Sequence, residues 1–432
     1  MKFTRKIAVT AIAALALLGT AACSKNGSSS SSSSSSKIPA KITKKTTVVF
    51  WHGMSRAQES TLKSLTSDFE KKNPNVTVKL QYQGQYTDLQ AKINSTLQSP
   101  NNLPTITQAY PGWLWNAAKS KMLVDLKPYI NDKNVGWGSA SASDINTDLL
   151  SGATINGTQY GIPFNKSVEV LVYNKTLLDK YGVKVPKTMA ELRSASEEIY
   201  KKSNHKVVGA GFDSLSNYYV LGMKDKGINL SSKVNFTGSD SKSVINYYAK
   251  GIKAGYFRTA GSENYLSGPF ANEKVAMFIG TSAGEGFVKK GVGSKFTYGV
   301  APRPSTYNMQ QGTDIYMFSH ASAMQKAAAF KYIKFLVSKS SQIKWANKTG
   351  YIPVTKAAMN APAYKSSKTS KVPAQLAKTT KHLYSVPVTK DSNAAYGQLN
   401  TIMQTIFAQA QKGNWDSAIT AGKAKFDSSW KQ

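Results

Sequence analysis

Short apolar runs alternate with helical patterns along most of this chain. Three segments rich in β-branched and aromatic residues predict strands: 46–52, 76–83 and 105–111. Helical patterns follow the first two, and in one of them Leu62, Leu65 and Phe69 share a single face. This rhythm of strand, helix and strand predicts an α/β protein with a largely parallel sheet covered by helices.

The same alternation continues toward the C-terminus. Further strands are predicted at 169–175, 207–213, 274–280 and 298–304. After 327–338 the pattern is helical, with Leu399, Ile402 and Ile406 on one face. Three capping boxes predict where helices begin: Ser55 with Gln58, Thr87 with Gln90, and Thr188 with Glu191.

The first 22 residues have a different pattern. A basic start is followed by an apolar run at 7–18, which is too short to cross a membrane and is typical of a secretory signal. Small residues then precede Cys23, the only cysteine. This arrangement resembles a bacterial lipobox, which implies that Cys23 is lipidated and becomes the new N-terminus. An ordinary cleaved signal with an incidental cysteine is the alternative.

A serine run, 28–36, follows this cysteine. Such a stretch cannot bury apolar surface, so we expect residues 23–45 to form a flexible linker that spans roughly 25 Å. The roughly 385 residues beyond it exceed the usual limit of ~250–300 residues for one core, which predicts two domains or lobes.

The chain is strongly basic, with 56 Lys and Arg against 23 Asp and Glu and a net charge of +33. Its lysines are scattered and its arginines are few, which argues against nucleic-acid binding. A positive surface suits a protein tethered beside anionic lipids and an anionic wall. An adhesive wall protein is therefore one alternative, and it predicts salt-sensitive binding to wall polymers.

Seven motifs occur in a recognisable order along the body. They are FWHGM (50–54), FEKKNPNVTVK (69–79), QGQY (83–86), LPTITQAYPGW (103–113), GIPFNKSVEVLVYNKTLLDKYGV (161–183), EKVAMFIGTSAGEGF (273–287) and NKTGYIPVTKAA (347–358). In order and spacing they resemble extracellular solute-binding proteins, family 1, of ABC importers, and most closely the glycerol-3-phosphate-binding branch. The resemblance covers about residues 46 to 430.

The resemblance implies a two-lobed, periplasmic-binding-protein-like α/β fold of type II, with a hinge and a ligand cleft between the lobes. The organisation predicted from it is a signal peptide at 1–22, the lipidated linker at 23–45, an N-terminal lobe at 46–160 plus about 312–345, and a C-terminal lobe at 161–311 plus about 346–432.

The resemblance also implies a function. A lipid-anchored monomer on the extracellular face of the membrane would capture a sugar or oligosaccharide by lobe closure and deliver it to permease subunits served by a separate ATPase. It would need no cofactor or metal and catalyse no reaction, and the chain has no G-x-x-x-x-G-K-[ST] loop of its own. Glycerol-3-phosphate or a glycerophosphodiester is the alternative ligand.

Candidate ligand-binding residues follow from matching the motifs one by one. The resemblance assigns Tyr86, Ser167, Ser282, Gly312 and Tyr351, with Lys166 as the neighbour that could replace Ser167 in the alignment. Aromatic faces pack on the C–H groups of sugars, so Trp51, Trp113 and Trp115 are added as candidates. Each has a structural alternative in the core or at the rim, and Gly312 could simply be a turn glycine.

Two positions depart from the glycerol-3-phosphate-binding pattern. Pro111 stands where those relatives carry a glutamate, and Ala395 stands where they carry an arginine that contacts phosphate. Because a bidentate arginine is a strong phosphate partner, its loss favours an uncharged sugar over a phosphorylated polyol.

The sequence also allows an enzyme. The stretch GTSAG (280–284) matches the nucleophile-elbow pattern, and Asp314 with His320 or His382 could complete a serine hydrolase. This pattern is short, and the same stretch already has a place in the solute-binding motifs. The four histidines are scattered and show no metal-ligand spacing.

Overall fold

A computed structural model describes residues 38–138 and 144–431. The predicted signal peptide, Cys23 and the serine run lie outside the described residues. Within the part of the chain that is described, none of the helices is both long enough and apolar enough to cross a membrane.

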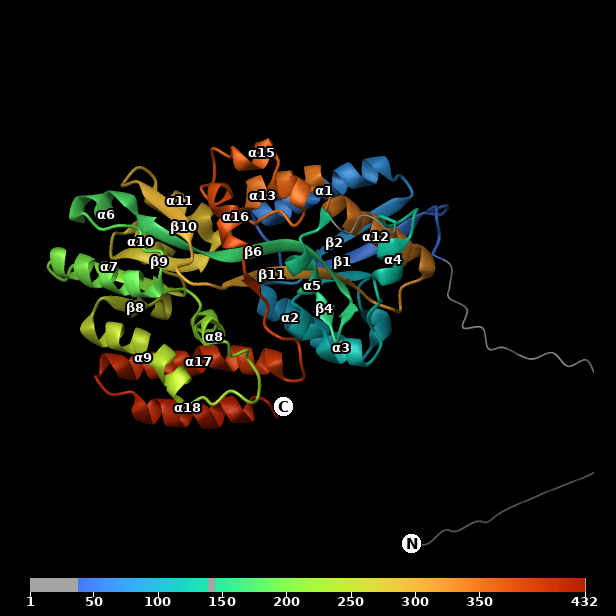
Figure 1. Cartoon of the computed structure of the whole chain (residues 1–432). Helices are drawn as coiled ribbons and strands as arrows, with labels where there is room; N and C mark the ends of the chain where they lie inside the picture. The colour runs from blue at the N-terminus through green and yellow to red at the C-terminus, as the bar shows by residue number, and fades with distance from the viewer. Residues whose placement is uncertain (1–37, 139–143, 432) are drawn as a thin grey trace, which may run out of the picture. The chain divides into compact units, whose positions relative to one another are not determined.

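The described residues form strands and helices in alternation (Figure 1). The strands are β1 (Thr46–His52), β2 (Val76–Tyr82), β3 (Ile106–Ala109), β4 (Thr154–Ile155), β5 (Thr158–Gln159), β6 (Gly161–Asn174), β7 (Val208–Phe212), β8 (Phe257–Thr259), β9 (Val275–Thr281), β10 (Tyr298–Pro302), β11 (Asn308–Met317) and β12 (Leu383–Tyr384). The α-helices are α1 (Ala57–Lys72), α2 (Tyr86–Thr96), α3 (Trp115–Lys119), α4 (Lys127–Asn131), α5 (Thr147–Ser151), α6 (Lys175–Tyr181), α7 (Met189–Lys202), α8 (Leu215–Asp225), α9 (Ser239–Ala254), α10 (Ser267–Ala271), α11 (Glu285–Val292), α12 (Ala323–Leu336), α13 (Lys339–Thr349), α14 (Lys356–Met359), α15 (Pro362–Lys365), α16 (Leu376–Thr379), α17 (Ser392–Gln411) and α18 (Asp416–Ser428).

One large sheet runs through the body in the order β2-β1-β3-β11-β6-β9-β7-β8, with β10 paired to β6 and β12 paired to β11. The pairs β1–β2, β1–β3, β7–β8 and β7–β9 are parallel, whereas β11 and β6 run antiparallel to their main neighbours. Figure 1 shows β6 and β11 crossing the middle of the molecule between its two ends. These two strands therefore join the parallel segments on either side.

Strand β6 changes partners along its length. Its residues 161–168 pair with β11, and its residues 169–174 pair with β9 and β10. The predicted strand at 169–175 covers only the second half. The first half was missed because its buried asparagine, lysine and serine, Asn165, Lys166 and Ser167, break the apolar run that predicts a strand.

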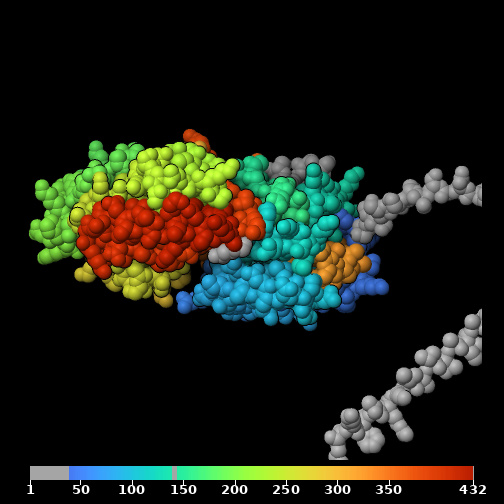
Figure 2. Space-filling view, turned by 90° about the horizontal axis from the view of Figure 1, so that it is seen from below, coloured from blue at the N-terminus to red at the C-terminus, as the bar shows by residue number. Residues whose placement is uncertain are grey.

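Four hydrophobic clusters form the core. Two contain mainly residues from 48–164 and 315–354, and two contain mainly residues from 168–309 and 346–426. The surface is divided in a similar way. Figure 2 shows the C-terminal helices α17 and α18 over one half of the face and residues of the N-terminal part of the body over the other half.

The body begins at Ile38, earlier than the pattern of residues suggested. Ile38 and Ile42 pack against one of the clusters, and the Lys45 ammonium donates to the Pro74 carbonyl at 2.7 Å. Residues 38–45 are thus attached to the body rather than extended from it.

Of the three predicted capping boxes, only Thr188 caps a helix, where its hydroxyl accepts from the Glu191 N–H at 3.1 Å. The prediction at Ser55 was wrong, because Arg56 precedes α1 with φ of 52°. The prediction at Thr87 was also wrong, since Gln85 and Asp88 form the box at α2. The earlier start places Tyr86 in the first turn of α2.

Candidate functional site

A cavity of about 400 Å³ lies beside β6 and β11, with walls from both halves of the sheet. This volume falls within the usual range for small-molecule sites. The lining residues are Tyr86, Gln90, Tyr110, Pro111, Gly112, Trp113, Gly152, Lys166, Ser214, Asn217, Met309, Gln310, Gln311, Gly312, Ser385, Val386, Pro387, Val388, Ser392, Asn393, Tyr396 and Gly397. The cavity lies past the carboxyl ends of β2 and β3, where open α/β sheets bind ligands.

Three aromatic rings form one wall. Tyr86 lies in the first turn of α2, Tyr110 directly follows β3, and Trp113 lies in the short 3-10 helix Pro111–Leu114. The ring centroids of Tyr110 and Trp113 are 5.2 Å apart, and Tyr86 meets both rings edge-on at 5.7 and 5.9 Å. Mutual packing of this kind holds aromatic faces in fixed orientations toward a ligand.

The Tyr86 hydroxyl is enclosed by polar side chains. It accepts hydrogen bonds from Asn165 Nδ2 at 3.1 Å and Gln108 Nε2 at 3.3 Å, and the Tyr351 hydroxyl lies 3.4 Å away. Burial raises the pKa of Tyr86 well above its usual value, so the phenol is neutral. With both lone pairs engaged by amides, this hydroxyl can only donate its own proton.

The floor of the cavity is built by β6 and β11. The Lys166 ammonium lies 3.0 Å from Asp314 Oδ1 and also donates to the Gly312 carbonyl at 3.0 Å. Burial raises the pKa of Asp314, and the neighbouring Lys166 opposes that shift. Gly312 has φ of 83°, and a Cβ there would lie 2.0 Å from the Asn165 carbonyl oxygen, so only glycine fits.

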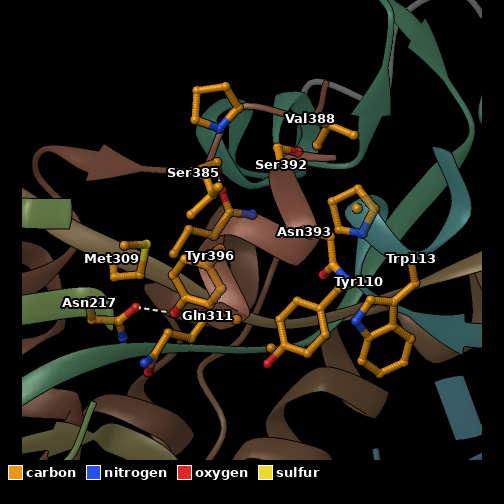
Figure 3. Close-up of a pocket in the computed structure, with 18 of the residues that line it drawn as sticks. Tyr110, Trp113, Asn217, Met309, Gln311, Ser385, Val388, Ser392, Asn393 and Tyr396 are labelled. Carbon is orange, nitrogen blue, oxygen red and sulfur yellow. Dashed lines mark hydrogen bonds between the residues drawn. The ribbon is translucent and has the colours of Figure 1, made fainter. Parts of the chain in front are cut away.

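The opposite wall comes from α8 and α17. The Tyr396 hydroxyl donates to Asn217 Oδ1 at 2.5 Å, and Figure 3 shows this pair across the cavity from Tyr110 and Trp113. Asn217 Nδ2 in turn donates to Glu169 Oε1 at 2.9 Å, behind the wall. Burial raises the pKa of Tyr396, which keeps this phenol neutral as well.

Comparison with known proteins gives this architecture a family. The sequence profile of the family described as bacterial extracellular solute-binding protein matches residues 64–374. The chain belongs to this family. It is a solute-binding protein of an ABC importer, and its family is extracellular.

Individual relatives agree with this assignment. The sn-glycerol-3-phosphate-binding periplasmic protein UgpB of Salmonella typhimurium is 25% identical over an alignment 342 residues long that covers 72% of this chain and 75% of that protein. The sugar-binding protein MalE from Xanthomonas citri has a TM-score of 0.78 at 19% identity, and UgpB from Mycobacterium tuberculosis in complex with glycerophosphocholine has a TM-score of 0.72 at 18% identity. Each alignment covers 89% of this chain and 98% of the other. The predicted family and the two-lobed α/β fold class are confirmed.

Three of the eight residues predicted to bind ligand line the cavity of this solute-binding protein: Tyr86, Trp113 and Gly312. Tyr351 lies behind Tyr86 and contacts it through the hydroxyl pair.

The other four do not line the cavity. Ser167 is 3% exposed and accepts from the Thr281 hydroxyl at 3.0 Å, and Ser282 is fully buried and accepts from the Val168 N–H at 3.3 Å. Trp51 donates to Gln81 at 2.7 Å and packs in a core cluster, against which Trp115 also packs. Whether any of the eight touches ligand stays a prediction.

Sequence reasoning missed Tyr110, Asn217, Gln311 and Tyr396 as lining residues. Tyr110 and Tyr396 lie in the two stretches that depart from the glycerol-3-phosphate-binding pattern, next to Pro111 and Ala395. Pro111 lines the cavity, whereas Ala395 is fully buried and its neighbour Tyr396 faces the cavity instead. A closer reading of the aromatic residues in those stretches could have found both tyrosines.

The residues considered as partners of Ser282 in a serine hydrolase, Asp314, His320 and His382, each contact other groups. His320 Nε2 contacts the Pro104 carbonyl at 3.1 Å, His382 packs against Tyr307, and Asp314 pairs with Lys166. Among the described residues, no group of three or more His, Cys, Asp or Glu side chains could hold a metal ion.

Proposed function

We propose that this solute-binding protein captures a sugar or oligosaccharide, and that it does so by closure of two lobes around the cavity. The single observation that carries this proposal is the chemistry of the lining. Aromatic rings face neutral amides and hydroxyls, which is the combination that packs on sugar C–H groups while pairing with sugar hydroxyls.

Charge at the site favours an uncharged ligand. Lys166 is the one charged side chain among the described lining residues, and its ammonium is already paired with Asp314 at 3.0 Å. A phosphate would therefore meet no free cation in the lining, although phosphate sites are typically built from unpaired arginine or lysine.

One lining residue offers an additional acceptor. The Oε1 atom of Gln311 is buried and has no hydrogen-bond partner among the described residues. A buried acceptor without a partner costs about 1–3 kcal/mol, so a ligand hydroxyl that donates to it would gain more than an ordinary hydrogen bond.

Glycerol-3-phosphate or a glycerophosphodiester is the second candidate. It is favoured by the first turns of α8 and α17, which bring Ser214, Asn217, Ser392 and Asn393 to the lining, since helix N-termini attract anions. The UgpB relative at 25% identity points the same way.

The remaining features of this proposal concern location and mechanism. Cys23 would carry the lipid anchor after cleavage of the signal at 1–22, and the protein would act as a monomer without catalysing a reaction.

The predicted lobes, 46–160 with about 312–345 and 161–311 with about 346–432, would move about β6 and β11. Ligand then shifts the population toward the closed form, because only that form brings both walls into contact with it.

A thermal-unfolding screen of the full-length chain in mild detergent tests the ligand class. Maltotriose, sn-glycerol-3-phosphate and glycerophosphocholine would each be added, since a ligand at about 100 times its dissociation constant stabilises by about 2.7 kcal/mol. We expect stabilisation by the oligosaccharide. Stabilisation by the phosphate compounds alone would instead support the second candidate.

A further inference from the structure

Glu169 is a buried carboxylate that does not line the cavity but is bonded to its wall. The whole residue is 1% exposed, and it lies where β6 leaves β11 and begins to pair with β9. Asn308 holds its backbone from β11, accepting from the Glu169 N–H at 3.2 Å and donating to the Glu169 carbonyl at 2.9 Å. The position of this carboxylate is therefore set by the crossing strands.

Arg303 supplies the counter-charge. Its Nε lies 3.4 Å from Glu169 Oε2, and both side chains are 2% exposed. Because a guanidinium stays protonated, a buried arginine requires an anionic partner, and Glu169 supplies it here. Burial raises the pKa of Glu169, while Arg303 and Asn217 oppose that shift.

The hydrogen bonds that connect Glu169, Asn217 and Tyr396 have a defined direction. An ionised carboxylate can only accept, so Asn217 must turn its NH₂ toward Glu169 and its Oδ1 away from it. That Oδ1 can only accept, so Tyr396 must donate its hydroxyl proton to Asn217. The Tyr396 oxygen then has no proton left for the cavity.

The geometry points to Glu169 as a positioning residue that, through Asn217, holds the Tyr396 hydroxyl as a hydrogen-bond acceptor toward the cavity. This inference rests on the proposed function and sharpens it, because a ligand must then donate a proton at Tyr396. A sugar hydroxyl can do so, whereas a phosphate or carboxylate oxygen without a proton cannot. The Ser214 hydroxyl, also in the lining, lies next to the same phenol oxygen. It can occupy one of the two lone pairs of the Tyr396 oxygen, and the other lone pair remains for a ligand.

Glu169→Gln is the informative substitution. Arg303 can only donate, so it would hold the new Oε1, and the new NH₂ would face Asn217. Asn217 would then reverse, and Tyr396 would accept from it and point its own proton into the cavity. The shape of the wall is retained while the polarity of one hydroxyl is inverted.

Raman spectra of the full-length chain in mild detergent test this reversal without any ligand, since the tyrosine doublet distinguishes a donating from an accepting phenol. Tyr396 is isolated by subtracting the spectrum of Tyr396→Phe from wild type, and that of Glu169→Gln/Tyr396→Phe from Glu169→Gln. We expect a donor signature in the first difference and an acceptor signature in the second. Identical signatures would overturn the inference.

Maltotriose binding by calorimetry gives the second readout. Glu169→Gln and Tyr396→Phe should each weaken binding about tenfold, and the double variant should lose no more than about threefold beyond either one. Additive losses would contradict a route through Tyr396. A wild-type chain that does not bind maltotriose would count against the proposed sugar ligand, and the Raman comparison would still decide the role of Glu169.

Two further variants control the experiment. Glu285→Gln makes the same change at another buried glutamate, which accepts from Tyr298 at 3.1 Å and lies outside the lining, and it should leave maltotriose affinity unchanged. If Glu169→Gln fails to fold, Asn217→Leu interrupts the chain of bonds and keeps the Glu169–Arg303 pair. It should remove the donor signature of Tyr396, and persistence of that signature would again overturn the inference.

Discussion

The two walls of the cavity hold their tyrosines in opposite ways. On the wall from α2 and β3, the Tyr86 hydroxyl accepts from two amides, so its proton is directed to the Tyr351 hydroxyl at 3.4 Å or to a ligand. On the wall from α8 and α17, the Tyr396 hydroxyl donates to Asn217 and is left to accept. The same residue type therefore offers complementary chemistry, because buried neighbours rather than the phenol decide where its proton goes.

The buried ion pairs behind the two walls also differ. Lys166 and Asp314 are 3.0 Å apart with a second bond to Gly312, whereas Arg303 and Glu169 are 3.4 Å apart with a bond to Asn217. The first pair anchors the floor of the cavity, and the second orients a side chain in the wall. Four predictions would break or sharpen this comparison.

The largest expected effect comes from breaking the pair in the floor. Lys166→Met leaves Asp314 buried without its partner, so the free energy of unfolding should fall by about 3–5 kcal/mol in denaturant titrations. The double variant Lys166→Met/Asp314→Leu should recover most of that loss. Lys344→Met, which breaks an exposed pair with Asp68 at 2.8 Å, should cost at most about 1 kcal/mol. Equal losses in the two single variants would show that burial does not matter here.

The second effect is a pH dependence near the polar wall. Asp213 directly precedes Ser214, and burial raises its pKa from 3.8 to about 7, with Glu169 adding to the rise. The folded state therefore holds a proton that the unfolded state releases, so stability falls as pH rises from about 4 to about 7.

Asp213→Asn removes this titration. Relative to wild type, the variant should gain stability across the same pH window, by on the order of 4 kcal/mol at neutral pH. Unfolding curves of both proteins below and above the window measure the difference. A constant difference at all pH values would mean that Asp213 keeps an ordinary pKa.

The third effect is on ligand affinity at the aromatic wall. Tyr86→Ala and Trp113→Ala should each weaken oligosaccharide binding by about 1–3 kcal/mol in calorimetry, since each removes a packed ring from the lining. Tyr351→Phe should have a smaller effect, because Tyr351 acts only through Tyr86. Tyr265→Ala, at an exposed tyrosine outside the lining, is the matched control. An unchanged affinity in both wall variants would contradict the site.

The smallest effect is a gain. Gly397 lines the cavity, and a Cβ built there meets nothing within 4 Å. Gly397→Arg would give the lining an unpaired cation, so affinity for sn-glycerol-3-phosphate should rise about tenfold relative to Gly397→Gln. If the two variants bind the phosphate equally, charge is not what excludes it.

Much of the fold could be predicted from the residues. The strands at 46–52, 76–83 and 274–280 agree with β1, β2 and β9 to within a residue, because each is a short apolar run between turn residues. The start of α2 could not be predicted in the same way, since Gln85 competed with Thr87 for the cap and local pattern did not distinguish them.

The site was predicted less completely. Of the residues matched by motif, Tyr86 and Gly312 line the cavity, whereas the Ser167 and Ser282 hydroxyls are buried and hydrogen-bonded away from it; contact with ligand stays a prediction for all four. A motif assigns a residue to a strand or a turn, but it does not tell whether the side chain points toward the cavity or into the core.

The sequence by itself determined the secondary structure pattern, the α/β class and the family, because hydrophobic periodicity and motif order are local properties of the chain. Only the tertiary structure decided which tyrosines face the cavity and how their protons are directed. The bond between Asn217 and Glu169 joins residues 48 positions apart, and the bond between Asn217 and Tyr396 joins residues 179 apart. Hydrogen bonds act over about 3 Å, so their direction depends on how distant segments pack together, which no local pattern contains.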